Sequence, residues 1–132
     1  MHYKTIFIFV ALILTASCSS VPAEFEQLDR TMFAYERALR WQNYDTVIAF
    51  HKNEYQNLTQ EKRKFLKKFR VTAYDEVYRK LENEGQSATQ VVEIKYYNNE
   101  YAVIKNMTLK NQWTYDKTSG RWFLTNPLPA FK

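Results

Sequence analysis

The chain has 132 residues, of which 25% are charged and 17% are aromatic, and its formal net charge is +5. A chain of this length is expected to form one domain around a single core. Its two glycines and three prolines are too few for a disordered or low-complexity protein. One cysteine and two histidines argue against a zinc site, which needs several such ligands. We therefore expect no metal and no cofactor.

A short apolar run near the N-terminus ends just before the only cysteine. The run, Ile6–Leu14, carries no charge, follows Lys4 and precedes Cys18. It is too short to span a membrane, which takes roughly 20 residues, but it fits the apolar region of a signal peptide, about 7–15 residues long. The layout resembles a bacterial lipoprotein signal, although the leucine of that signal stands one place early. An ordinary secretory signal with a chance cysteine is the alternative interpretation.

The resemblance implies that residues 1–17 are removed and that Cys18 becomes an acylated N-terminus carrying palmitate-type chains. Acylation would also account for a lone thiol in an exported chain. Ser19 follows the cysteine where many inner-membrane lipoproteins carry Asp, so the resemblance implies transport to the outer membrane, with the domain facing the periplasm. Residues 18–23 are then a tether that contains Pro22, and residues 24–132 are the single domain.

The first part of this domain has helical spacing. Apolar residues step by three and four along residues 23–41, which predicts an amphipathic helix with one core-facing stripe: Phe25, Leu28, Met32, Tyr35 and Leu39. Asp45 is expected to cap a second, short helix through His51, and Thr59 to cap a third helix over residues 60–70. The apolar side of the third helix is expected to consist of Phe65, Leu66 and Phe69.

After the third helix the period changes from 3.6 to two, which predicts strands. We expect strands over residues 71–81, 87–97, 100–115 and 121–125, joined by hairpins at Gly85, at Asn98-Asn99 and at residues 116–120. Helices followed by an antiparallel meander indicate the α+β class. The predicted architecture is a set of N-terminal helices packed on a curved antiparallel β-meander of about four strands.

Three features resemble the nuclear-transport-factor-2-like superfamily of α+β cones. They are the long first helix, the second helix that opens with Asn43-Tyr44-Asp45, and a late strand that reads Gly120-Arg121-Trp122-Phe123-Leu124. The chain also resembles small lipoproteins of Gram-negative bacteria that carry this domain. The resemblance implies a conical interior, which in relatives serves as an enzyme site, a ligand pocket or a packed core.

Enzymes on this fold often use a buried Asp or His together with a Tyr as general acid and base. The residues that could take these roles are Asp29, His51, Tyr74 and Asp75. Each also has a structural interpretation: Asp29 on the wet flank of the first helix, Asp75 in a cross-strand ion pair, and His51 beside the last carbonyls of the second helix. A Ser-His-Asp triad is disfavoured, because the only serines beyond the tether fall at predicted turns.

Two groups of side chains indicate possible binding surfaces. Aromatic residues on the predicted strands suit a half-buried sheet face, but they also suit a ligand or partner surface: Tyr74, Tyr96, Tyr97, Trp113 and Trp122. Cations crowd the third helix and form either a solvated face or a contact for anionic lipid head groups: Lys62, Arg63, Lys64, Lys67, Lys68 and Arg70. Nucleic acid is the weakest interpretation of these cations in the expected compartment.

Taken together, these patterns predict an outer-membrane-anchored periplasmic domain without catalytic activity. We expect it to bind or scaffold an envelope protein, or to take a small apolar ligand in the cone. The alternative is a small acid/base enzyme, similar to an isomerase or dehydratase, that uses cone-lining Asp, Tyr and His. We also expect contact with the membrane through the lipid anchor, no nucleic-acid partner, and a homodimer through the sheet face.

Overall fold

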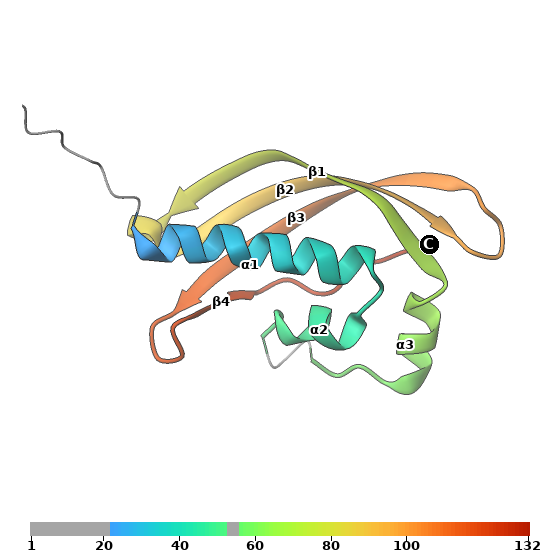
Figure 1. Cartoon of the computed structure of the whole chain (residues 1–132), viewed down its shortest axis with the longest axis horizontal. Coiled ribbons are helices and arrows are strands. Elements are labelled where there is room, and N and C mark those ends of the chain that lie inside the picture. Colours follow the sequence, from blue (N-terminus) through green and yellow to red (C-terminus); the bar gives the residue numbers. More distant parts are fainter. Residues whose placement is uncertain (1–21, 53–55) are drawn as a thin grey trace, which may run out of the picture.

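A computed structural model describes residues 22–52 and 56–132, so the predicted signal peptide, Cys18 and most of the tether lie outside the described residues. The helices are α1 (Ala23–Arg40), α2 (Tyr44–Ala49) and α3 (Gln60–Leu66). The strands β1 (Phe69–Glu82), β2 (Ser87–Asn98), β3 (Ile104–Asp116) and β4 (Arg121–Leu124) follow, with a short 3-10 turn, η2 (Asn83–Gly85), between the first two. They form one antiparallel sheet in the order β1-β2-β3-β4 (Figure 1). The predicted α+β meander is thereby confirmed.

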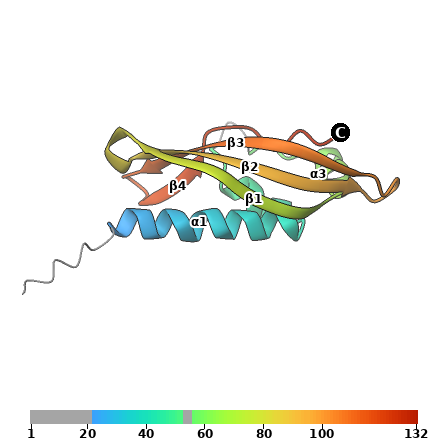
Figure 2. The same cartoon turned by 90° about the horizontal axis from the view of Figure 1, so that it is seen from above.

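The predicted stripe of α1 faces the sheet. Leu28, Met32, Tyr35 and Leu39 are buried, whereas Phe25 is half-buried beside Gly85 of η2. Acidic residues in the first turn and arginines in the last turn complement the helix dipole. Figure 2 shows α1 along one face of the sheet, with the other face uncovered by α1. No helix in the described ranges is both long enough and apolar enough to cross a membrane.

Three helix boundaries differ from the prediction, and one of them is the end of α2, which lies at Ala49 instead of His51. The side chain of Asn43, not Asp45, caps α2 by accepting a hydrogen bond from the Thr46 N–H. Thr59 caps α3 as predicted, with its hydroxyl accepting from the Lys62 N–H. This helix nevertheless ends at Leu66 instead of residue 70. It ends early because Phe69 already pairs with Asn98 as the first residue of β1, and a residue cannot serve both structures.

The strands follow the prediction except at the β2–β3 turn. The third strand begins at Ile104 and not at residue 100, because the Asn98 carbonyl accepts hydrogen bonds from the Tyr101 and Ala102 N–H groups and closes a turn. Ala102 has a φ of 51° in this turn. The pairing of β1 with β2 contains two register shifts, one between Val71 and Ala73 and one between Glu76 and Tyr78. Such bulges bend a strand and increase its twist.

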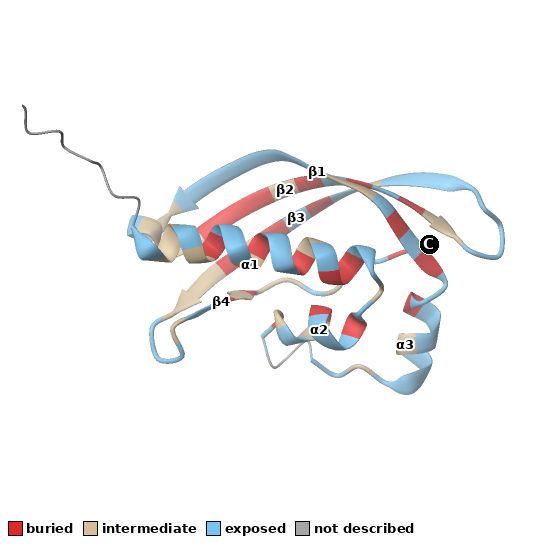
Figure 3. Cartoon of the chain, in the orientation of Figure 1, coloured by how far each residue is buried: buried red, intermediate tan, exposed pale blue. Residues whose placement is uncertain are grey.

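The core fills the space between α1, α2 and the arching sheet (Figure 3). Tyr35 lies at its centre and makes edge-to-face contacts with Phe50 and Trp113, each with ring centroids 5.7 Å apart. A second aromatic cluster joins Phe69, Tyr96 and Phe131 near the other end of the sheet. Every buried hydrophobic residue of the described part lies between Leu28 and Phe131. Residues 23–132 therefore contain this entire core, and we expect them to fold as a unit.

Candidate functional site

Of the four residues predicted for acid/base catalysis, Asp29 and Tyr74 line one groove, whereas Asp75 and His51 lie elsewhere. Asp29 lies on the exposed flank of α1, where it forms an ion pair with Arg79 of β1. Asp75 is exposed on the outer face of the sheet, away from α1. The predicted cross-strand cation is not its partner, because the register places Glu93 opposite it. Like charges placed opposite each other on a sheet repel, so this pair does not stabilise β1 against β2.

His51 is fully buried just beyond the end of α2, and its backbone N–H donates to the Ile48 carbonyl in the last turn of that helix at 3.0 Å, as predicted. Its side chain turns to other partners. Its Nδ1 lies 2.7 Å from the Asn126 carbonyl oxygen, and its Nε2 lies 3.3 Å from the Tyr35 hydroxyl. Since a carbonyl only accepts, Nδ1 carries the proton and Nε2 accepts from the tyrosine. Burial lowers the pKa of His51 and raises the pKa of Tyr35, which keeps both groups neutral. The pair has no open path to a substrate and ties α1 to the segment after β4.

A chain of hydrogen-bonded polar side chains crosses the inner face of the sheet. Gln90 of β2 is its centre: its Oε1 accepts from the Trp113 Nε1–H at 3.1 Å and from the Asn111 Nδ2–H at 3.2 Å. The Gln90 Nε2–H donates to Glu76 Oε2 at 2.6 Å. Asn111 also donates to the Tyr74 hydroxyl at 3.3 Å. These bonds satisfy polar groups that would otherwise be costly at buried positions.

The polar chain opens to the surface in a groove between α1 and β1, which we call the α1–β1 groove. Its volume is about 420 Å³, and its lining consists of Asp29, Met32, Phe33, Glu36, Tyr74, Glu76, Arg79 and Gln90. Arg79 donates to both carboxylate oxygens of Glu76, at 3.0 Å each, and also to Asp29. Asp29 and Glu76 thus share the Arg79 guanidinium, and Glu36 pairs with Arg40 at 3.3 Å. The three carboxylates outnumber these two guanidiniums by one, so the groove has an acidic balance. Burial, followed by the charge of Glu36, raises the pKa of Tyr74 and keeps it protonated.

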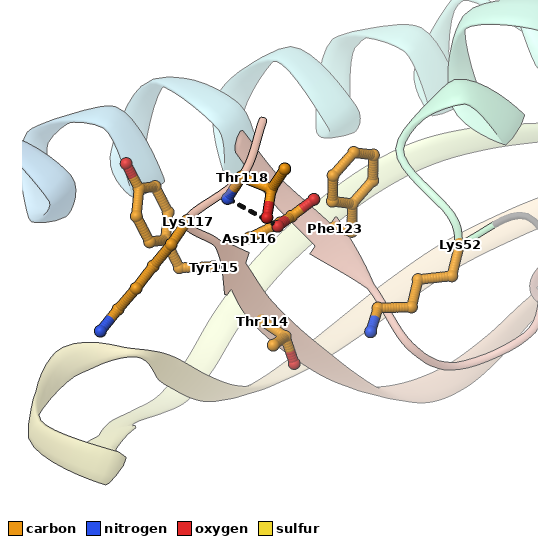
Figure 4. A pocket seen from close by; sticks show the side chains of 7 residues that line it. All are labelled: Lys52, Thr114, Tyr115, Asp116, Lys117, Thr118 and Phe123. Atoms are coloured by element: carbon orange, nitrogen blue, oxygen red, sulfur yellow. Dashed lines mark hydrogen bonds between the residues drawn. The ribbon is translucent and has the colours of Figure 1, made fainter. Parts of the chain in front are cut away.

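A hollow of about 740 Å³ lies beside the β3–β4 hairpin (Figure 4). Its central carboxylate, Asp116, accepts hydrogen bonds from the Ser119 hydroxyl and from the Thr118 N–H, both at 2.9 Å. These bonds lower the pKa of Asp116, so it stays ionised and is a poor general acid. In this view Lys52 and Lys117 extend on opposite sides of it. The contacts of Asp116 are those of a hairpin turn and do not form an acid/base pair.

The predicted aromatic surface divides between core and exterior. Tyr96, Trp113 and Trp122 are buried and pack within the core, so none of the three lies on a surface that a partner can reach. Tyr74 lines the α1–β1 groove, and Tyr97 is half-buried on the outer sheet face opposite Ile104.

The six predicted cations also divide. Arg63 pairs with Asp45 at 2.7 Å, and Lys68 pairs with Glu100 at 3.1 Å. The remaining four are exposed: Lys62, Lys64, Lys67 and Arg70.

Two features of the structure escaped the sequence interpretation. The first is the polar chain around Gln90 and Asn111. The strand alternation could have found it, because both positions share the inward parity of Val92 and Leu109. The second is the exposed apolar turn at Tyr101 and Val103. Apolar and smaller or polar residues alternate there as they do in a strand, so the sequence predicts a strand instead of a turn. Within residues 22–52 and 56–132, no group of three or more His, Cys, Asp or Glu side chains is placed to hold a metal ion.

No protein-family model and no curated protein matches the chain, whereas several solved structures do. A SEC-C motif-containing protein from Rhodopseudomonas palustris superposes with a TM-score of 0.58 at 13% identity, over 82% of this chain and 89% of that chain. A second one, from Psychrobacter arcticus, gives 0.59 at 9% identity, over 81% of this chain and 63% of that one. A ketosteroid isomerase-like protein from Erwinia carotovora atroseptica superposes with a TM-score of 0.57 at 13% identity, over 80% of this chain and 93% of that chain.

At these identities the likeness shows the fold and does not extend to activity. The shared architecture is a group of helices followed by a curved, four-stranded antiparallel sheet. It is consistent with the nuclear-transport-factor-2-like cone that the sequence resemblance implies.

Proposed function

We propose that the chain is a lipoprotein of the outer membrane, acylated at Cys18, whose periplasmic α+β domain binds a partner and does not catalyse a reaction. The lipid anchor is supported by the sequence around Cys18, which resembles a lipoprotein signal. The non-catalytic role is supported by the interior of the cone. There the polar side chains bond to each other, and bulky aromatic residues such as Trp113 fill the remaining space.

The acid/base alternative has less support from the geometry. A general base must reach the proton it abstracts within hydrogen-bond distance. His51 is buried with both ring nitrogens engaged, Asp29 is paired with Arg79, and Asp75 faces outward, away from the cone. Asp29 and Tyr74 share the α1–β1 groove, but the ion pair with Arg79 occupies Asp29, and the raised pKa of Tyr74 makes its hydroxyl a poor base.

The binding surface that we propose is the α1–β1 groove. Phe33 stands exposed at its rim with 59% of its surface accessible, next to the carboxylates of Asp29, Glu36 and Glu76. A basic side chain of an envelope protein complements this acidic balance. Arg37 already lies over the Phe33 ring, at 5.8 Å from its centroid, which shows that this rim accepts a guanidinium. A small apolar ligand is less favoured, because burying it would strip water from three carboxylates. The homodimer through the sheet face stays a prediction.

The anchor is tested by fractionating cell envelopes that contain the full chain or its Cys18→Ala variant. The full chain should sediment with membranes and carry acyl mass on Cys18, and the variant should lose both properties. Unchanged sedimentation of the variant would refute the anchor and leave the binding surface to be judged separately.

The groove is tested with penta-lysine as a cationic probe and penta-glutamate as its control, using residues 23–132 and amide chemical shifts. Penta-lysine should shift the signals of Arg79 and Gln90, and penta-glutamate should not. Asp29→Asn combined with Glu36→Gln should weaken the binding by about fivefold per carboxylate removed. The matched pair on the outer face, Asp75→Asn and Glu93→Gln, should leave the affinity unchanged. Equal losses in the two pairs, or no shift in the groove, would reject this surface.

A further inference from the structure

The net charge of the chain is concentrated in two short segments. Residues 61–70 and 98–105 together hold seven Lys or Arg and two Glu, a balance of +5 that equals the formal charge of the whole chain. The rest of the sequence therefore has as many acids as bases. The concentration is not explained by the proposed groove, which is acidic and lies elsewhere.

The structure brings these two segments together at one end of the molecule. The Asn99 N–H donates to the Lys68 carbonyl at 2.8 Å, and the Asn99 side-chain amide donates to the Lys67 carbonyl at 3.3 Å. Lys68 Nζ also pairs with Glu100 at 3.1 Å. On the other side, the Gln42 amide donates to the Lys67 and Phe69 carbonyls, which fixes the α3–β1 joint to the end of α1. The basic helix and the β2–β3 turn are thus held as one unit.

The β2–β3 turn presents apolar side chains to solvent at the tip of the molecule. Tyr101, Val103 and Ile104 are 73%, 57% and 67% exposed, and Phe65 of the neighbouring helix is 47% exposed. The turn projects beyond the rest of the sheet in Figures 1 and 2, and we call its exposed apolar side chains the apolar knob. We call this turn together with α3 and residues 67–70 the basic apex.

We propose that the basic apex is a docking surface for anionic bilayers. Aromatic and aliphatic side chains on a projecting tip can enter the head-group region, and surrounding lysines are attracted to lipid phosphates. The basic apex has both properties that such a surface needs, exposed apolar side chains and an excess of positive charge. Nucleic acid complements the lysines alone and leaves Val103 and Ile104 in water.

The position of the apex gives the docked domain an orientation. The start of α1, which follows the tether, and the β2–β3 turn lie at opposite ends of the long axis (Figure 1). Helix α1 alone separates them by about 27 Å, at 1.5 Å per residue. A domain attached at both ends therefore lies along the membrane. The apex does not depend on acylation of Cys18, and it is tested without the anchor.

The test uses residues 23–132, which hold the described core, and sedimentation with vesicles. Vesicles with phosphatidylglycerol should bind the protein, vesicles of phosphatidylcholine alone should bind it much more weakly, and salt should reduce the binding. Val103→Asp combined with Ile104→Asp should weaken the phosphatidylglycerol binding at least tenfold. Val77→Asp is the control, because Val77 is 54% exposed on β1 outside the basic apex. This substitution should change the binding to phosphatidylglycerol vesicles little.

A second pair of variants tests the charges. Lys64→Glu with Lys67→Glu should weaken vesicle binding on the order of fivefold per lysine, whereas Lys110→Glu with Lys117→Glu, at exposed positions elsewhere, should have a much smaller effect. Circular dichroism and thermal melts confirm that each variant is folded. The proposal is overturned if the protein does not bind phosphatidylglycerol vesicles, or if test and control variants lose equal affinity. It is also overturned if the protein binds nucleic acid in preference to these vesicles.

Discussion

Gln90→Leu should destabilise the domain although leucine is the more hydrophobic residue. The change removes the acceptor of two buried donors, the Trp113 Nε1–H and one Asn111 Nδ2–H. Each buried donor left without a partner costs about 1–3 kcal/mol, and the added apolar burial of leucine returns about 1–2 kcal/mol. The Glu76 carboxylate loses a third bond but keeps Arg79. The middle of these ranges gives a net loss of about 2–3 kcal/mol in the free energy of unfolding.

Urea unfolding of residues 23–132, followed by circular dichroism, measures this loss. The same substitution in a Trp113→Phe background isolates the tryptophan bond, because the indole donor is then absent. In that background Gln90→Leu should cost about 1–2 kcal/mol less. An unchanged or higher stability of Gln90→Leu, or an identical cost in both backgrounds, would refute the view that the network contributes through paired donors.

Three further predictions concern pH and the backbone. Burial lowers the pKa of His51 in the folded state, so its stabilising contribution is complete above about pH 6.5. The contribution declines below that pH, because the unfolded chain gains a proton first. Urea midpoints measured between pH 8 and 5 should show the decline, and His51→Gln should make the decline smaller. Gly85→Ala should cost about 1–3 kcal/mol in a thermal melt, because φ is +82° and a Cβ would lie 2.7 Å from Phe25; Phe25→Leu should recover only part of it. Ala102→Gly should instead gain up to about 1 kcal/mol by relieving a φ of 51°, and a loss would contradict this reading of the turn.

The fold was largely predictable because its elements have strong periodic patterns. The stripe of α1 and the alternation of β2 each depend on side chains that are close in sequence. The boundaries that failed depend on distant contacts. Phe69 continues the helical spacing of Phe65, yet its pairing with Asn98 assigns it to β1. Tyr101 and Val103 continue a strand pattern, yet bonds to the Asn98 carbonyl and to the α3–β1 joint close a turn.

The candidate site was less predictable, for a related reason. Asp29 and Arg79 are 50 positions apart, and their contact requires the rotation of α1 about its axis as well as the register of β1. His51 was expected at a helix end, but its burial is set by the bridge that the backbone after α2 makes to Leu124. The basic helix was visible in the sequence. Its association with an apolar tip required the contacts between Lys68 and Asn99.

The register shifts in β1 also bear on self-association. This strand of 14 residues is the open edge of the sheet, and an unbroken edge of that length would offer its free backbone groups to a strand from another copy. The two bulges interrupt the regular spacing of those groups, and the charges of Arg79 and Lys80 lie beside the second one. A strand of a second copy that paired with β1 would lose backbone hydrogen bonds at both bulges. This edge is therefore poorly suited to joining copies of the chain into a continuous sheet.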